Sequence, residues 1–586
     1  MIDFMGLPDP VQEIRDKVNF WHTQMASHLG RFNTYADYWR LNRPSRSADL
    51  SGFANPQVTE TLRATEAVAT FYYRALTSAQ PNFQLVSSNP MVSQEDLWTA
   101  EQVIVWQQNV TNYRRKLLKA CRSAALFGTV PVEQPWVVNM PYWESTDFQP
   151  RSLLQFAFDP MSFDMSLSPW HAVLVYMTPE QLRALGRQMP DVWDQDLIEK
   201  AIGASSEVKN LSPEIQSRMN AAGYSMFSGN NKTSNIIEVT MYYGELNGDR
   251  NGTEWCIATV NDLFTVKMHA NVYKRRPFSF GHVMEFEMEP YAYAVGSVAM
   301  QTQPEINSNR ARMHDTITFS LFNQWLVNSQ ANLKTGQLKI KPWGMVQVDG
   351  DPDAMIKALR PQLEGVNFGM QLENLMKQEF RGAALAPDNL QAIVTEASAT
   401  EASIAQTEAI RRLSVQAEVF ADPILREHIS KMHENNITFL DKPFSIAATG
   451  RYENLRVYPG DLVEDVEVQV KVVTDKDFRP QRNKDLLQFL QVVTSIRNQN
   501  PQLGQVNLQP FVEEFARAVG MNPRQVWSAI PQLPGMDSQA GGPGIPGAMP
   551  RMAAGVANAE ATARSTGAEL GHQARTMAAE NMAEAL

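Results

Sequence analysis

The clearest pattern of apolar and polar positions lies between residues 291 and 432. Five large apolar side chains recur there at spacings of seven and four residues: Ile306, Met313, Ile317, Leu321 and Trp325. These spacings place them on one stripe of an α-helix. The pattern predicts a helix from about residue 296 to about residue 327, about 45 Å long at 1.5 Å per residue. The other faces of this helix are polar.

A second helix is predicted from residue 367 onward. Its apolar residues are spaced by four and again form one stripe: Phe368, Leu372, Met376 and Phe380. Two antiparallel helices joined by a short insert would form a narrow hairpin, in which each helix has an apolar stripe to cover. Copies of the hairpin standing side by side would cover these stripes. An ordinary helical hairpin inside a large domain remains the alternative.

The insert between the two helices has the alternation of strands. Residues 338–341 and 345–348 alternate apolar and polar side chains, which is typical of short strands. Asp351-Pro352 then predicts the start of a short helix that ends near Pro361. The insert is therefore predicted to be a compact strand-and-helix unit at the tip of the hairpin.

A loop is predicted after the second helix. Residues 382–388 read Gly-Ala-Ala-Leu-Ala-Pro-Asp, which breaks the helical pattern. Ser398 and Glu401 form a capping box that begins a third long helix. About sixteen residues separate the two helices, and their apolar side chains are too few for a core of their own. Loops of this length in compact domains are usually functional or mobile.

Both helical and strand patterns flank this stretch, and they predict an α+β fold that is mostly helical. Helices are predicted at 11–28, 56–79, 93–127 with a break near Thr111, from 178, from 212, and at 481–497, 510–519 and 523–530. Strands are predicted at 130–175, 236–246, 254–260, 263–268, 282–288 and 445–473. Residues 534–550 are a Gly/Pro-rich linker, and the Ala-rich residues 551–586 suit either a helix or a disordered chain.

The composition is that of a globular protein with a large core. Of 586 residues, 44% are hydrophobic and 20% are charged. The chain has no apolar run of 18 residues, so no membrane span is expected, and its first residues lack the pattern of a signal peptide. The two cysteines, Cys121 and Cys256, have no metal-site spacing and suggest a reducing compartment.

The net charge of −11 argues against a protein that grips nucleic acid along a basic surface. Two local basic clusters occur, one at residues 114–122 and one at residues 274–276. The first is more simply interpreted as a solvated helix face, and the second as the flank of a strand, than as phosphate-binding sites.

Motifs for catalysis are missing from the sequence. It contains no phosphate-binding loop, no H-E-x-x-H, no G-x-S-x-G and no G-x-G-x-x-G. Residues 349–353 begin like a calcium loop, but Pro352 interrupts it and the sixth and twelfth positions are Ala354 and Arg360. We therefore expect no catalytic residues, no metal site and no cofactor. An uncharacterised enzyme, such as a nuclease or hydrolase, remains a less favoured alternative.

The order of these elements resembles the portal protein, or head-to-tail connector, of tailed double-stranded DNA phages, especially the short-tailed ones. The most recognisable pieces are the step Tyr291-Ala292-Tyr293-Ala294-Val295-Gly296-Ser297 before the long helix and the run Ser398-Ala399-Thr400-Glu401 before the third helix. The resemblance extends over roughly residues 56–530, and it leaves out the first fifty residues and the tail from 532.

The resemblance implies a ring, usually of twelve copies, at one capsid vertex, through which double-stranded DNA is packaged and ejected. The implied regions are a wing at 1–295, stem helices at 296–328 and 367–383, a clip at 329–366, a tunnel loop at 384–398, a second wing part at 399–475, a crown at 476–531, and a tail at 532–586 that is a barrel or disordered. Implied partners are further copies of the chain, the terminase packaging motor, tail adaptors, capsid and scaffolding proteins, and no membrane. The protein would be assembled in the host cytoplasm and reside in the virion.

The resemblance also implies which residues serve each region. These are Pro387, Asp388, Asn389 and Gln391 in the tunnel loop; Gln301, Asn307, Arg310, Arg312 and Asp315 in the stem; and Lys339, Lys341, Trp343 and Asp349 in the clip. Another ring-forming phage protein, such as an adaptor or collar, remains an alternative.

A conduit must let DNA slide without holding it. Twelve copies at −11 each would carry about −132 formal charges, which disfavours tight phosphate contact along the bore. Uncharged polar side chains would provide a wet and weakly adhering lining, and Gln301, Asn307, Asn389 and Gln391 are the candidates.

Overall fold

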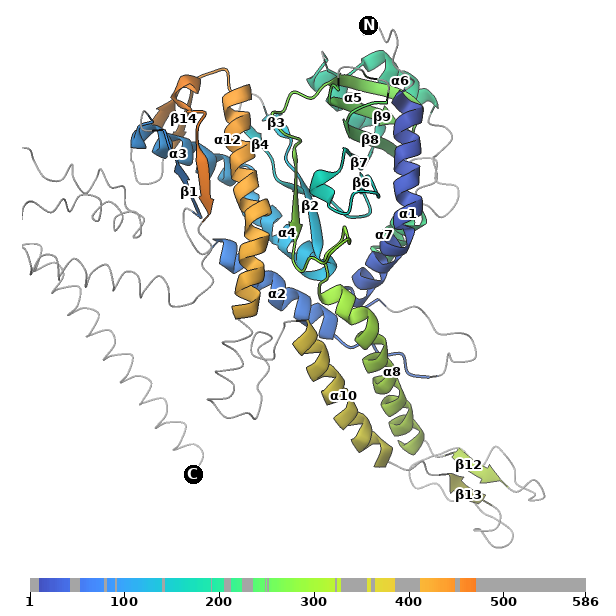
Figure 1. Ribbon diagram of the computed structural model, residues 1–586. Helices are drawn as coiled ribbons and strands as arrows, with labels where there is room; N and C mark the ends of the chain where they lie inside the picture. Colours follow the sequence, from blue (N-terminus) through green and yellow to red (C-terminus); the bar gives the residue numbers. More distant parts are fainter. Residues whose placement is uncertain are drawn as a thin grey trace, which may run out of the picture. The chain divides into compact units, whose positions relative to one another are not determined.

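The computed structural model describes residues 10–42, 53–77, 82–89, 92–139, 143–190, 192–204, 212–223, 236–247, 249, 252–321, 324–327, 356–359, 364–384, 411–447 and 454–470. Helices and antiparallel strands alternate along this part of the chain (Figure 1), which confirms the α+β class. None of the described helices combines the length and the apolarity that a membrane crossing needs.

The first four helices of the described chain are α1 (Pro10–Trp39), α2 (Glu60–Thr77), α3 (Gln94–Val110) and α4 (Tyr113–Phe127). The predicted cap and break of the third helix are confirmed, because the Ser93 side chain accepts a hydrogen bond from the amide of Asp96 and the helix ends at Thr111. Gly128 ends α4 with φ +83°, and a Cβ there would lie 1.9 Å from the carbonyl oxygen of Ala292. Only glycine suits both the backbone angle and this close approach.

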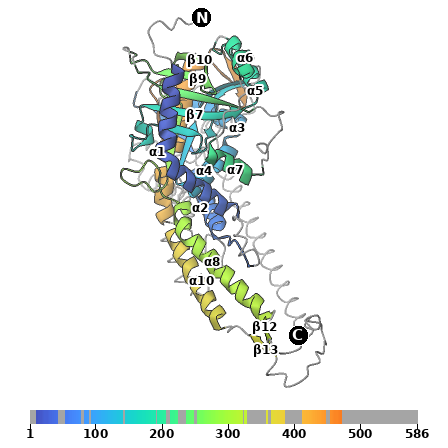
Figure 2. The same cartoon turned by 90° about the vertical axis from the view of Figure 1, so that its right-hand side faces the viewer.

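A five-stranded antiparallel sheet has the order β10-β9-β8-β7-β6. Its strands are β6 (Phe156–Phe158), β7 (Trp170–Met177), β8 (Ile237–Gly244), β9 (Trp255–Val260) and β10 (Phe264–Ala270). The predicted meander of three strands is confirmed as β8, β9 and β10. Helix α1 runs alongside this sheet in both ribbon views (Figures 1 and 2) and shares a core with it.

Three shorter helices accompany the sheet: α5 (Pro179–Gln188), α6 (Gln195–Ala204) and α7 (Pro213–Ala221). The sequence places the starts of α5 and α7 correctly, since Thr178 and Gln181 form the expected capping box and Pro213 is the first residue of α7, whereas α6 was not predicted. Leu182 of α5 and Ile198 of α6 join a second core with strands β8 and β9. The short helix η2 (Met165–Leu167) lies between β6 and β7.

A three-stranded sheet has the order β11-β2-β5, with β2 (Thr129–Glu133), β5 (Gln149–Pro150) and β11 (Phe278–His282). The strand that we predicted at 282–288 is wrong in position, because β11 ends at His282. Beyond it, Met284 and Tyr293 form a single bridge. The strand stops there because the chain folds back on itself at residues 285–290, which are mostly exposed.

The largest core lies between this sheet, helices α2 to α4 and a long C-terminal helical stretch. That stretch is helical at 411–421, has a π-turn at Asp422–Arg426 and continues as α12 (Glu427–Phe439). Pro423 has no N–H to donate, which explains the local change to the wider turn. Across the sheet, a Cβ on Gly281 would lie 2.5 Å from the Phe420 ring and 2.6 Å from Ile424.

Three strand pairs complete the body, and each is antiparallel. They are β1 (Phe83–Val86) with β16 (Glu467–Val470), β3 (Trp136–Asn139) with β4 (Trp143–Thr146), and β14 (Phe444–Ala447) with β15 (Asn454–Val457); η5 (Pro459–Asp461) precedes β16. The strands predicted within 445–473 are confirmed, and Val468 and Val470 lie on the side of β16 that packs on the core.

The predicted hairpin consists of α8 (Val295–Leu321) and α10 (Glu364–Ala383) (Figure 1). The first helix is shorter than predicted, because Gln324–Val327 forms strand β12 and pairs with β13 (Ile356–Leu359). Trp325 is therefore in a strand, and part of the predicted short helix at 351–361 is a strand as well. The predicted strands at 338–341 and 345–348, residues 385–410 and everything after 470 lie outside the described residues.

Candidate functional site

The end of the hairpin nearest the body is fixed by polar contacts to the chain that enters α2. The amide of Val58 donates to Asn307 Oδ1 at 2.9 Å, and Asn307 Nδ2 donates to Gln57 Oε1 at 2.8 Å. Gln303 Nε2 donates to the Val58 carbonyl at 2.9 Å. Asn307 is only 1% exposed, so the expectation that it lines a channel is wrong. It is buried because its amide satisfies backbone and side-chain groups of its own subunit.

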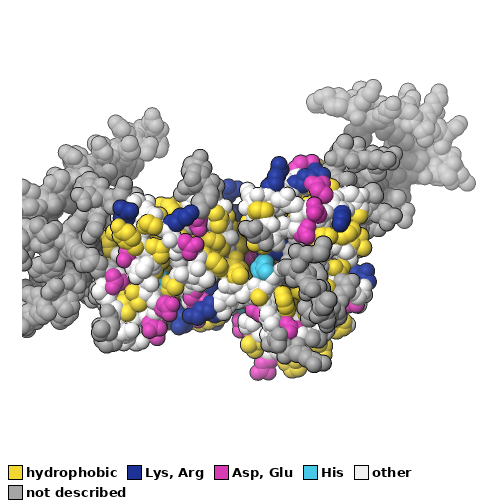
Figure 3. Space-filling model, turned by 90° about the horizontal axis from the view of Figure 1, so that it is seen from above, with side chains coloured by type: hydrophobic (Ala, Val, Ile, Leu, Met, Phe, Trp, Pro, Cys, Tyr) yellow, Lys and Arg dark blue, Asp and Glu magenta, His cyan; other side chains and the backbone are white. Residues whose placement is uncertain are grey.

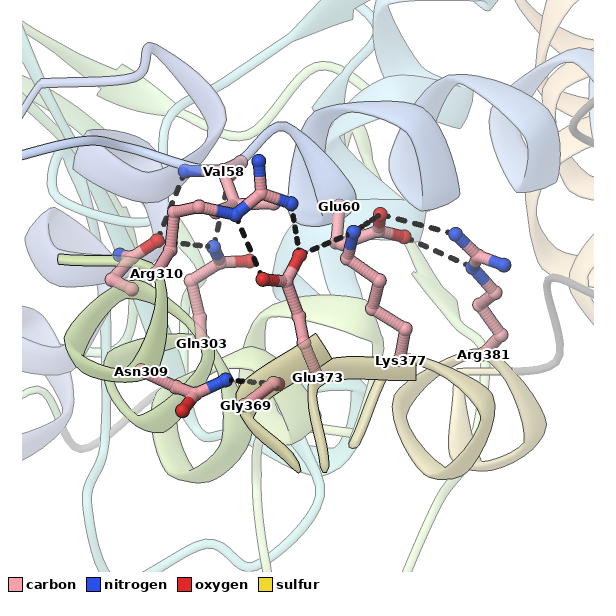
Figure 4. A network of polar contacts seen from close by, with 10 residues as sticks. Val58, Glu60, Gln303, Asn309, Arg310, Gly369, Glu373, Lys377 and Arg381 are labelled. Atoms are coloured by element: carbon pink, nitrogen blue, oxygen red, sulfur yellow. Dashed lines mark hydrogen bonds and ion pairs between the residues drawn. The ribbon is translucent and has the colours of Figure 1, made fainter. Parts of the chain in front are cut away.

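A row of charged side chains joins α10 to both α8 and α2 (Figure 4). Arg381 Nε and Nη2 donate to the two carboxylate oxygens of Glu60 at 3.0 and 3.1 Å. Lys377 lies 2.6 Å from Glu373 Oε1 and 3.7 Å from Glu60 Oε1. Arg310 Nε donates to Glu373 Oε2 at 2.7 Å, and its Nη2 donates to Oε1 of the same carboxylate. We name these five side chains the charged relay.

Both carboxylates of the charged relay are buried, and the cations that hold them are less so. The side chains of Glu60 and Glu373 are 2% and 3% exposed, whereas that of Arg310 is 37% exposed. Burial opposes ionisation of Glu373, but the hydrogen bonds from Arg310 and Lys377 outweigh it and lower the pKa of this carboxyl. The bond to Glu373 in turn raises the pKa of Arg310. Glu373 and Arg310 therefore both carry their charges at neutral pH, and the bonds between them tie α10 to α8.

The two helices approach each other closely beside this relay. Asn309 Nδ2 donates to the Gly369 carbonyl at 2.8 Å. A Cβ on Gly369 would lie 2.8 Å from the Met313 side chain, so a larger residue would push α10 away from α8. The hairpin is therefore packed helix on helix at this level, with glycine permitting the approach.

The apolar stripes of the hairpin change character along its length. Ile306 and Phe380, near the body, are fully buried, whereas Leu321 and Phe368, toward β12 and β13, are each 70% exposed. The exposed apolar side chains are Ile317, Leu321, Phe368, Met370, Leu372 and Leu375, which we name the hairpin patch. Phe368, Leu372 and Leu375 recur at spacings of four and three and so share one face of α10, and a monomeric soluble protein rarely leaves such an apolar face in water. The patch is the strongest candidate for an interaction surface.

The other residues expected in the stem have different environments. Gln301 and Arg312 are exposed, while Asp315 accepts a hydrogen bond from the amide of Ala54 at 2.7 Å. The expected tunnel-loop residues (Pro387, Asp388, Asn389, Gln391) and clip residues (Lys339, Lys341, Trp343, Asp349) lie outside the described residues. Of the stem set, the structure places Asn307, Arg310 and Asp315 in contact with partners of the same chain.

Sequence reasoning missed the two buried carboxylates at the centre of the relay. Glu373, Lys377 and Arg381 are spaced by four, which puts an acid and two bases on one face of a helix. That spacing is a usable signal for an intrahelical pair. The partner Glu60 is more than 300 residues away in the sequence, and no local pattern points to it.

Groups for catalysis are sparse in the described ranges. No set of three or more His, Cys, Asp or Glu there could hold a metal ion. Cys121 and Cys256 are buried and unpaired, and burial raises the pKa of both thiols, which makes them poor nucleophiles. A cavity of about 610 Å³ beside α7 is lined by Asp37, Asn42, Pro213 and polar residues of α7, and it brings together no acid–base pair.

The described surface seen from above mixes acidic, basic and apolar side chains, and neither sign of charge dominates the face in view (Figure 3). The family model described as "Phage SU10 portal protein" matches residues 153–546, about two thirds of the chain. That span contains the whole hairpin and the five-stranded sheet. A search of the curated proteins found no match.

Proposed function

Because the chain belongs to the family described as phage SU10 portal protein, we propose that it forms a ring at one capsid vertex through which double-stranded DNA is packaged and ejected. Proteins of this kind are structural parts of the virion rather than enzymes. Twelve is the expected number of copies. The resemblance of the element order and the family match point to the same role over largely the same span of the chain.

The single observation that carries the ring is the hairpin patch. It lies on the part of α8 and α10 that no other described segment of the same chain covers. Fully burying one Leu or Phe side chain contributes about 1.5–3 kcal/mol, so packing several of them between neighbouring hairpins would strongly stabilise a ring. The charged relay holds each hairpin to its own body while its outer half packs against the neighbours.

In this proposal α8 and α10 are the stem, and the segment between them, including β12 and β13, is the clip. The clip would meet the terminase motor during packaging and tail adaptors afterwards, with Lys339, Lys341, Trp343 and Asp349 as contacts. Residues 384–398 would form the tunnel loop beside the DNA, and Gln301 and Arg312 remain exposed candidates for the stem surface. Capsid and scaffolding proteins would contact the outer parts. An adaptor or collar ring is the second candidate, since it too would bury the hairpin patch.

Ring formation is tested on the full-length protein by native mass spectrometry and light scattering. We expect the double variant Leu372→Glu with Leu375→Glu to lose the ring, because two charges replace exposed apolar side chains at the contact. The matched control Gln371→Glu with Gln378→Glu adds the same charge at exposed polar positions of the same helix and should keep the ring. A wild-type protein that stays monomeric at micromolar concentrations would refute the proposal.

The portal role, as distinct from any ring, is tested by packaging. We expect deletion of residues 388–392 in the proposed tunnel loop to leave rings intact but to reduce the DNA that particles package or retain. Normal packaging by the deletion variant would count against this loop. If the wild-type protein forms rings that take no part in DNA packaging, the adaptor or collar is favoured.

A further inference from the structure

A second exposed apolar surface lies far from the hairpin patch in the sequence. Its side chains are Met161, Phe163, Leu167, Phe286 and Met288, each between 54% and 77% exposed. They belong to two segments, one around η2 and one between β11 and α8. Isolated exposed apolar residues are ordinary, but a group of five this exposed marks an interaction surface.

The two segments lie side by side at the end of β11. Helix η2 packs against β11, and the carboxylates of Asp164 and Glu285 both lie close enough to the His282 ring to influence it. Met288 has φ +60°, which is unusual for a residue other than glycine. The Met288 side chain is 70% exposed, which leaves a large apolar group in water.

Carboxylates surround these apolar side chains. Glu285, Glu287 and Asp164 are exposed, and Asp159 and Glu289 are half-buried. Arg31 lies beside Tyr293 at one margin, and Arg276 donates to the carbonyls of Ser168 and Pro169 at another. We name this surface the acidic–apolar patch. Its negative charge favours a basic partner, and its apolar side chains favour a partner that packs directly against it.

A basic surface of suitable character is present on the same chain. Arg114, Arg115 and Lys119 on α4 are exposed and form no ion pair within the described residues. The neighbouring Arg122, by contrast, pairs with Glu66 at 3.0 Å, and Lys116 pairs with Asp147. We name the three unpaired cations the α4 basic face. Exposed charges in a row without partners are available to a second molecule.

The two surfaces sit at opposite ends of α4. The segment that carries the acidic–apolar patch is adjacent to the C-terminal end, where Gly128 approaches Ala292. Arg114 and Arg115 are in the first turn of this 15-residue helix, about 20 Å away along its axis. One copy can therefore engage a neighbour through each surface at the same time. Contacts between two different surfaces of identical subunits are what closes a ring.

We propose that the acidic–apolar patch of one copy docks on the α4 basic face of the next copy. The inference rests on the proposed ring and adds a second contact to it, away from the hairpin. A basic segment of a different protein is the competing occupant. A second copy is favoured because the complementary basic surface is already part of every subunit.

Charge reversal on the full-length protein tests this contact directly. The acidic-side variant is Glu285→Lys with Glu287→Lys, and the basic-side variant is Arg115→Glu with Lys119→Glu. All four positions are exposed, so each variant should fold, which circular dichroism checks. Alone, each variant brings like charges together at every junction, and we expect the protein concentration at half-assembly to rise at least about tenfold.

An equimolar mixture of the two variants supplies the decisive result. In a ring in which the two variants alternate, every junction again joins opposite charges. The protein concentration at half-assembly should therefore return toward the wild-type value, and native mass spectrometry should show equal numbers of the two variants in each ring. The control Asp441→Lys with Glu464→Lys reverses two exposed acids elsewhere and should leave assembly unchanged.

Three outcomes would overturn the inference. Variants that assemble like wild type show that the patch is not an intersubunit contact, while the ring itself stands. Variants that fail singly and are not rescued in the mixture show that the two surfaces do not meet. Normal rings that lose binding to a basic capsid or scaffolding protein assign the patch to that protein. A wild-type chain that never forms rings refutes the proposed function instead.

Discussion

Replacing Glu373 by glutamine tests whether the charged relay anchors the hairpin. The side chain is 3% exposed and accepts hydrogen bonds from Arg310 and Lys377. Glutamine keeps the shape and one acceptor oxygen but removes the charge that both cations share. Loss of one partner from a buried ion pair costs about 3–5 kcal/mol. Arg310 is 37% exposed, so water screens its interaction with Glu373. We therefore expect Glu373→Gln to destabilise the attachment of α10 by about 1–3 kcal/mol.

The loss should be local, because the relay joins α10 to α8 and α2 rather than crossing the whole core. Hydrogen exchange followed by mass spectrometry on peptides from residues 364–383 measures the opening of α10 directly. A cost of about 1–3 kcal/mol corresponds to exchange about 5 to 150 times faster. Peptides from the five-stranded sheet should exchange at the wild-type rate.

The matched control is Glu379→Gln, which removes the same charge from an exposed position of α10. It should leave exchange nearly unchanged. Equal protection of α10 in wild type and Glu373→Gln would show that the relay contributes nothing to anchoring. Equal loss in both variants would show that only the net charge of the helix matters.

The pH dependence of the same experiment follows from the direction of the pKa shift. The pKa of Glu373 is lowered in the folded protein from an ordinary value of 4.5. The carboxylate therefore contributes stability that is present above about pH 4.5 and is lost as the pH falls through the lower, folded pKa. The difference in exchange protection of α10 between wild type and Glu373→Gln should be constant near pH 7 and should shrink below pH 4.5.

Two further variants test the core. Gly281→Ala should lower the unfolding temperature, at a cost of about 1–3 kcal/mol, because its Cβ would lie 2.5 Å from the Phe420 ring. The control Gly30→Ala has open space around its Cβ in α1 and should leave the unfolding temperature unchanged. Equal unfolding temperatures of the two variants would contradict the packing around Gly281. Burial lowers the pKa of His428 to about 3, so the wild type should lose stability as the pH falls from 6.5 toward 3. In denaturant titrations, His428→Phe should remove about 1–2 kcal/mol of the stability loss between pH 7 and pH 5. Identical pH profiles of the two proteins would show that His428 does not cause this loss.

Local signals in the sequence predicted those elements whose causes are local. The Ser93 and Thr178 caps, the break at Thr111 and the meander of β8 to β10 depend on residues within a few positions of one another. The end of α8 could not be predicted in this way. Gln324–Val327 continues the apolar spacing of the helix, yet it forms a strand because Ile356–Leu359 pairs with it, and the paired residues are 29 to 35 positions apart in the sequence.

Local sequence patterns likewise predict some features of the candidate site and not others. The apolar stripes of α8 and α10 were predictable from their periodicity, as was their need for cover by other side chains. The burial of Asn307 was not visible, because its cover comes from Gln57 and Val58, about 250 residues earlier. A polar face on a helix therefore does not show whether water, the same chain or another copy lies against it.

The hairpin combines two kinds of contact that suit two different tasks. Charged and amide groups hold its inner half to the body, where directional bonds fix the angle at which α8 and α10 leave it. Apolar side chains occupy its outer half, where burial is non-directional and stabilises whatever packs there. In the proposed ring, an anchor made of ion pairs within one subunit would form before any neighbour arrives, so each copy would present its apolar surface already oriented. A ring built from such subunits needs no reordering of the hairpin at each contact, which lowers the entropic cost of closing it.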